Sequence, residues 1–155
     1  MQTLDNDPEE PEPRAPCLPS PIALSADKVI AMAHLPAAPH VAVLGHHTLS
    51  FVLALMDCGC SYVRSLRPDA AAPDCEAADL AWIVDVANDT ELDDALRAAR
   101  RRTGDRGKIV VEGTICQSCR SLLQHVANAD LDIVSFDHFS QRVVLAAKHR
   151  LAMAA

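Results

Sequence analysis

Short apolar runs alternate with amphipathic segments over most of the chain after residue 39. Four runs have the length and composition of strands: 40–44, 61–66, 80–86 and 108–113. Three segments have apolar positions at helical spacing: 48–58, 91–102 and 115–128. The run 80–86, LAWIVDV, is apolar almost throughout, which is typical of a strand buried on both faces of a parallel sheet. This alternation predicts an α/β domain.

Two of the expected helices carry further signals. The helix at 48–58 is expected to bury one face, formed by Leu49, Val52, Leu53 and Met56. The segment from Thr90 to Asp93 has the form of a capping box, so the helix at 91–102 is expected to begin there.

Both ends of the predicted domain add elements to this alternation. Ser25 is the expected N-cap of a short helix at 26–35. The chain closes on two apolar segments, 131–139 and 141–149, whose short connection around Ser140 predicts an antiparallel pair. We therefore expect a Rossmann-like, mostly parallel sheet with helices on both faces and a C-terminal antiparallel hairpin. A ligand of such a sheet binds at the carboxyl ends of the strands.

The beginning of the chain differs in composition from the rest. Eight of the ten prolines lie in residues 1–39, and residues 1–22 hold five acids and a single base, Arg14. Such a segment cannot bury enough apolar surface to order itself. We expect residues 1–22 to form a disordered acidic, proline-rich tail, which either only solvates the protein or binds a partner, and residues 23–155 to form one domain.

Composition and charge exclude several classes of protein. Half of the residues are hydrophobic but 3% are aromatic, so the core must consist mainly of aliphatic side chains. A net charge of −7 argues against a general nucleic-acid-binding protein. No apolar run approaches the roughly 20 residues of a membrane span, and the N-terminus lacks the profile of a secretory signal. These features predict a cytoplasmic protein with free thiols.

Candidate polar chemistry follows the first predicted strand, in the stretch VAVLGHHTLSFVLALMDCGC at 41–60. A strand, a glycine turn at Gly45 and a helix form the usual opening of nucleotide-binding α/β domains. His46 and His47 follow the glycine, and Asp85 ends the predicted central strand. A histidine paired with this carboxylate is a candidate general base. The alternative is that the two histidines are polar loop residues.

Cysteines supply a second candidate site. In EGTICQSCRSLL, at 112–123, Cys116 and Cys119 lie at the first turn of a predicted helix, where the helix dipole lowers thiol pKa values. They are candidates for dithiol redox chemistry, with Cys116 as nucleophile, or are small helix residues. The cysteines at 58, 60 and 75 do not give the paired spacing of a structural zinc site, so no metal is predicted.

The order of these elements resembles the class I S-adenosylmethionine (SAM)-dependent methyltransferases. The resemblance covers residues 26–149 and rests on four segments: VAVLGHHTLS, ADLAWIVDV, RRTGDRGKIVVEGT and DIVSFDHFSQRVVLAAK. It implies the Rossmann-like sheet with a terminal hairpin. It also implies that SAM, where the site is intact, binds at Gly45, His46, Thr48 and Asp85.

The cofactor motif departs from the family pattern. That pattern reads acid-x-Gly-x-Gly-x-Gly, and when Gly45 takes the first glycine, Val43, His47 and Leu49 replace the acid and the other two glycines. The acid expected after the second strand is missing, and residues 67–79 are too few for the usual helix and third strand. We therefore predict a degenerate, non-catalytic domain that binds a ligand or a partner. The alternatives are an active small SAM-dependent methyltransferase and a thiol-redox protein.

Overall fold

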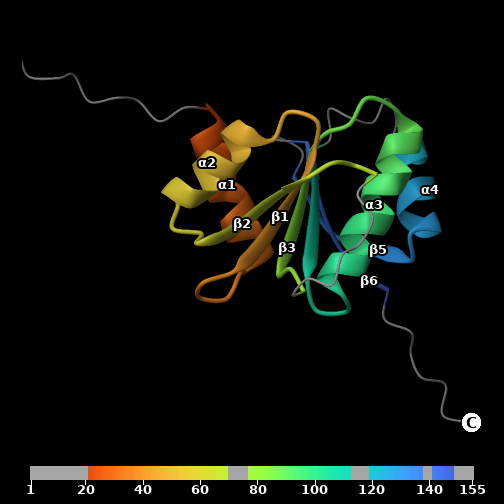
Figure 1. Cartoon of the computed structure of the whole chain (residues 1–155). Coiled ribbons are helices and arrows are strands. Elements are labelled where there is room, and N and C mark those ends of the chain that lie inside the picture. Colours follow the sequence, from red (N-terminus) through yellow and green to blue (C-terminus); the bar gives the residue numbers. More distant parts are fainter. Residues whose placement is uncertain (1–20, 70–76, 113–118, 138–140, 149–155) are drawn as a thin grey trace, which may run out of the picture.

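The computed structural model describes residues 21–69, 77–112, 119–137 and 141–148, which form one sheet with helices on both faces (Figure 1). In chain order the elements are α1 (Pro21–Ala33), β1 (His40–Gly45), α2 (Leu49–Asp57), β2 (Tyr62–Leu66), β3 (Leu80–Asp85), α3 (Asp89–Thr103), β4 (Lys108–Glu112), α4 (Cys119–Asn128), β5 (Leu131–Asp137) and β6 (Arg142–Ala147).

The six strands have the spatial order β2-β1-β3-β4-β6-β5. The first four are parallel, whereas β6 runs antiparallel to both β4 and β5. The predicted α/β sheet with a C-terminal antiparallel hairpin is therefore confirmed. Because β6 is antiparallel, its first residue, Arg142, lies opposite Glu112, the last residue of β4. The ends of β1, β3 and β4 and the start of β6 thus share one edge of the sheet, called here the carboxyl edge.

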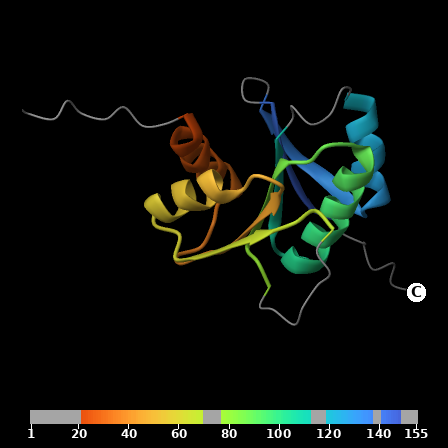
Figure 2. The same cartoon turned by 45° about the horizontal axis from the view of Figure 1, so that its top comes forward.

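Two apolar layers hold the helices to the sheet. The pair α1 and α2 covers one face, and α3 and α4 cover the other (Figure 2). On the α1 and α2 side, Trp82 is fully buried and meets the ring of Phe51 edge-on, with centroids 5.1 Å apart. On the other side, Leu92 and Leu96 of α3 are fully buried against the sheet. The core is mainly aliphatic, as the composition predicted.

The buried face of α2 matches the prediction only at Val52, which is partly buried against the cluster that holds Ala54 and Leu55. Leu49, Leu53 and Met56 are 71%, 52% and 53% exposed, whereas Ala54 and Leu55 are buried. Nearly every residue of this helix is apolar, so helical spacing alone could not select the face. The position of α1 selects it, because α1 packs on α2 and shares one apolar cluster with Ala54 and Leu55.

Two predicted helix starts are also wrong. α1 begins at Pro21, so Ser25 lies inside the helix and is not its N-cap. Proline is favourable at a first helical position because it has no N–H to leave unpaired there. α3 begins at Asp89, and its N-cap is Asn88 rather than Thr90. The side-chain oxygen of Asn88 accepts a hydrogen bond from Glu91 N at 2.9 Å.

In the part of the chain that the structure describes, no helix is both long enough and apolar enough to cross a bilayer.

Candidate functional site

Gly45 brings the end of β1 against the end of β3. Its φ is +155°, and a Cβ at this position would lie 2.8 Å from both the backbone N and the backbone O of Asp85. The N–H of the next residue, His46, donates to that same Asp85 oxygen at 3.0 Å. A side chain at position 45 would therefore force the two strand ends apart, so glycine is required for this close approach.

His47 pairs with the carboxylate of Asp85. Its Nδ1 lies 2.6 Å from Asp85 Oδ2, and its backbone N–H donates to the same oxygen at 3.2 Å. The side chains of His47 and Asp85 are 91% and 40% exposed. The structure thus brings together the histidine and the carboxylate that the sequence singled out, on the surface of the carboxyl edge.

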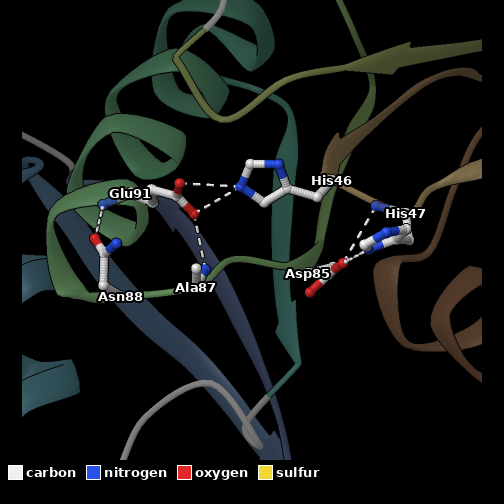
Figure 3. Close-up of polar contacts among 6 residues, drawn as sticks. All are labelled: His46, His47, Asp85, Ala87, Asn88 and Glu91. Atoms are coloured by element: carbon white, nitrogen blue, oxygen red, sulfur yellow. Dashed lines mark hydrogen bonds and ion pairs between the residues drawn. The ribbon is translucent and has the colours of Figure 1, made fainter.

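His46 points in another direction, toward the first turn of α3 (Figure 3). Its Nε2 lies 3.0 and 2.9 Å from the two carboxylate oxygens of Glu91. Glu91 Oε2 also accepts the N–H of Ala87 at 2.8 Å. The hydrogen bond from the Ala87 N–H, and to a smaller extent the one from the His46 ring, stabilise the ionised carboxylate. They lower the pKa of Glu91 below its usual range.

Sequence reasoning missed Glu91 as a site residue, although a signal was present. Asn88 and Glu91 have the N-cap and N3 spacing of a capping box, in which the glutamate reaches back to a backbone N–H before the helix. The prediction put that box two residues too late, at Thr90. Because the capping box begins at Asn88, Glu91 lies in the first turn of α3, where its side chain contacts His46 of the loop after β1.

Thr48, which was expected to bind a cofactor, lies at the start of α2 and is used in a contact within the protein. It is 6% exposed, and its hydroxyl is hydrogen-bonded to the hydroxyl of Ser65 in β2. This contact ties the start of α2 to the neighbouring strand. Leu49, which replaces the last glycine of the family pattern, is largely exposed at the first residue of α2.

The polar groups of the loop after β1 therefore bond to other parts of the same protein, at its surface. A loop that cradles a nucleotide offers free backbone N–H groups to its ligand. Here Asp85 accepts both N–H groups that follow Gly45, those of His46 and His47. The two imidazole rings point to different carboxylates on different elements, and Figure 3 shows them on opposite sides of the loop. The rings thus do not converge on one reacting atom.

The cysteines divide between described and undescribed segments. Cys119 is the first residue of α4, and Cys116 lies outside the described residues, so the dithiol prediction stays untested. Cys58 and Cys60 lie between α2 and β2, at the amino edge of the sheet. Burial, the hydrogen bond from Cys58 Sγ to Asp27 Oδ1 (3.1 Å) and the Asp27 charge together raise the pKa of Cys58 to about 11. Within the described ranges, no three His, Cys, Asp or Glu side chains are grouped to hold a metal ion.

Comparison with known proteins gives matches to structures alone. No protein-family model matches the chain, and no curated protein matches it. Among solved structures, the CcbJ methyltransferase of Streptomyces caelestis is 14% identical with a TM-score of 0.62, over 84% of this chain and 91% of that one.

Two further solved structures show the same likeness. The ribosomal protein L11 methylase of Lactobacillus delbrueckii is 13% identical with a TM-score of 0.61, over 83% of this chain and 77% of that one. The SAM-bound amino pentose methyltransferase CalS10 of Micromonospora echinaspora is 12% identical with a TM-score of 0.54, over 83% and 90%. These likenesses show that the chain has the class I SAM-dependent methyltransferase-like fold.

Proposed function

We propose that this chain is a non-catalytic methyltransferase-like domain that has lost the usual SAM site and binds a different ligand at its carboxyl edge. One observation carries the proposal: Asp85 accepts both backbone N–H groups that follow Gly45. These are the donors that a glycine loop normally presents to a ligand. A cofactor that needed them would first have to displace the Asp85 oxygens.

The arrangement of the histidines supports the absence of catalysis. Acid–base catalysis requires a side chain within hydrogen-bond reach of the proton that it transfers, with other groups oriented around the same substrate atoms. The His46 ring contacts Glu91 of α3, and the His47 ring contacts Asp85 at the end of β3. Each ring therefore links the loop to a different element of the fold.

An active small methyltransferase is the alternative. The close approach at Gly45 and the carboxylate of Asp85 favour it, because both features of a nucleotide-binding strand end are retained. The two functions differ in one property, which is binding of SAM by the natural protein.

The test is the melting temperature of the natural protein with and without saturating SAM or S-adenosylhomocysteine. A ligand that binds the native state alone stabilises it, by about 2.7 kcal/mol at 100 times its Kd. We expect no rise in melting temperature for the natural protein. A rise would overturn the proposal and favour the active enzyme.

Two variants identify what blocks the site. His47→Gly/Leu49→Gly restores the family's glycines, and a rise in melting temperature with SAM for this variant alone would assign the block to these two side chains. Leu53→Gly is the matched control, because it puts a glycine at another exposed leucine of α2 without touching the loop. Its melting temperature should not respond to SAM.

Two predictions from the sequence remain proposals beside this one. The acidic segment expected at 1–22, of which Pro21 and Ile22 lie in α1, is proposed to bind a partner or to solvate the domain. Thiol-redox activity of Cys116 and Cys119 requires an activated thiol, so a pKa of Cys116 near 8.5 or above, measured by the pH dependence of alkylation, would remove that alternative.

A further inference from the structure

A cavity lies between α3 and the segment that follows β2. Figures 1 and 2 both show the chain crossing from the end of β2 to the side of α3. The volume of the cavity is about 210 Å³, and among the described residues its lining is formed by Asp69, Asp94, Arg97 and Arg101. This lining includes neither histidine of the β1 loop, so the cavity is distinct from the contacts of His46 and His47.

Three of the lining residues share one face of α3. Asp94, Arg97 and Arg101 are three and four positions apart, so their side chains follow one another along the helix. The helix buries a different face against the sheet, which includes Leu92 and Leu96. The side chain of Arg97 is 57% exposed, and Arg101 is also exposed. A ligand can therefore reach both guanidinium groups without disturbing the core.

The cavity is lined by two positive and two negative charges. Arg97 Nη1 lies 3.6 Å from Asp94 Oδ1, a distance at which these two charges partly compensate each other. Asp69 and Arg101 are the remaining pair of opposite charges, and within the described part of the chain no ion pair joins them to each other. One carboxylate and one guanidinium group thus line the same cavity without bonding to each other.

We propose that this cavity binds a small zwitterion, a molecule with one carboxylate and one ammonium group, such as a free amino acid. The ligand's carboxylate binds Arg101, because a guanidinium group offers parallel N–H donors that match two carboxylate oxygens. Its ammonium group binds the carboxylate of Asp69. A ligand with a single charge is attracted by one of these residues and repelled by the other. The inference goes beyond the proposed function and does not depend on it.

The volume of the cavity limits the size of the ligand. A cavity of about 150 Å³ can hold a benzene molecule. The cavity beside α3, at about 210 Å³, can hold a ligand that is somewhat larger. Serine is of this size. Because exposed charge pairs contribute little to binding, we expect a dissociation constant of about 1 mM for serine.

Serine and its two single-charge analogues test the proposal. 3-Hydroxypropanoate lacks the ammonium group of serine, and ethanolamine lacks its carboxylate. Each compound is titrated into the ¹⁵N-labelled natural protein at constant pH and ionic strength, and NMR follows the backbone amide and arginine Nε–H signals of α3. We expect saturable shifts with serine, and binding of each analogue that is weaker by about tenfold or more.

Three variants separate this site from general attraction of ions. Arg101→Gln and Asp69→Asn each remove one of the two charges and keep a polar side chain. Arg106→Gln is the matched control, because Arg106 is an exposed arginine just after α3 that does not line the cavity. Circular dichroism checks that each variant is folded.

Serine should bind Arg106→Gln as tightly as the natural protein, and should bind Arg101→Gln and Asp69→Asn about tenfold or more weakly. The proposal is overturned if serine causes no saturable shift in the natural protein, or if either analogue binds as tightly as serine. It is also overturned if removing the charge of Arg101 or of Asp69 leaves the affinity for serine unchanged. Binding of SAM tests the proposed function separately and leaves these expectations in place, so the two failures are distinguishable.

Discussion

Replacing Gly45 by alanine tests the close approach on which the site depends. The structure puts the new Cβ 2.8 Å from the backbone N and O of Asp85, and backbone atoms cannot swing aside as a flexible side chain can. A matched control is Gly59→Ala. Gly59 also has a positive φ, +96°, but a Cβ there meets nothing within 4 Å.

The difference between the two variants isolates the contact. Both glycines have a positive φ, and a residue with a Cβ held in such a sparsely populated region is strained by about 1–3 kcal/mol, so both variants carry a backbone cost of this kind. Overpacking of a well-packed site adds about 1–3 kcal/mol, and that cost falls on Gly45→Ala alone. We therefore expect Gly45→Ala to be less stable than Gly59→Ala by about 1–3 kcal/mol.

Urea unfolding followed by Trp82 fluorescence measures this difference, because Trp82 is fully buried and is the single tryptophan. With a slope of about 1–3 kcal/mol per molar urea, the two midpoints should be separated by about 1 M. If the two variants unfold within about 0.5 kcal/mol of each other, the ends of β1 and β3 are not in close contact at Gly45, and position 45 does not require glycine.

Three further predictions follow from the described contacts. The pKa of Glu91 is lowered from 4.5, so its carboxylate stabilises the fold above pH 4.5 and loses this contribution as the pH falls through the lowered pKa. The natural protein should therefore be more stable than Glu91→Gln in urea unfolding above pH 4.5, and this difference should shrink below pH 4.5. A difference in unfolding free energy that stays constant with pH would contradict the stabilising role of the ionised Glu91. With its pKa raised from 9.0 to about 11, Cys58 has about 100-fold less thiolate at pH 8 than a thiol of pKa 9.0, but its thiolate is about tenfold more nucleophilic. Its alkylation, followed by peptide mass spectrometry, should therefore be about tenfold slower, and Asp27→Asn should speed the reaction. Leu55→Ala should cost about 2–5 kcal/mol in unfolding free energy, whereas Leu53→Ala should cost less than 1 kcal/mol; equal costs would contradict the face assigned to α2.

The order of elements could be predicted because strands and helices leave different periods in the sequence. The apolar run that became β3 and the closing hairpin β5–β6 were predicted within a few residues of their observed bounds. The buried face of α2 could not be predicted, because LSFVLALMD is apolar on every side and α1 decides which side is covered.

The site could be predicted only in part, for a similar reason. The pairing of His47 with Asp85 follows from two strand ends that share one edge. The pairing of His46 with Glu91 joins residues 45 positions apart and depends on where α3 begins, which the sequence pattern put at Thr90. Arg142 Nε donates to Glu112 Oε1 at 2.7 Å, and this pairing depends on the register of β4 and β6, which no local pattern encodes.

The proposed function requires that the natural protein does not bind SAM. Calorimetric titration of the natural protein with SAM, and separately with S-adenosylhomocysteine, measures this binding. We expect no heat of binding, because the N–H groups of His46 and His47 are already hydrogen-bonded to Asp85. Micromolar binding with one ligand per chain would overturn the proposed function and would make a methyltransferase assay the next experiment.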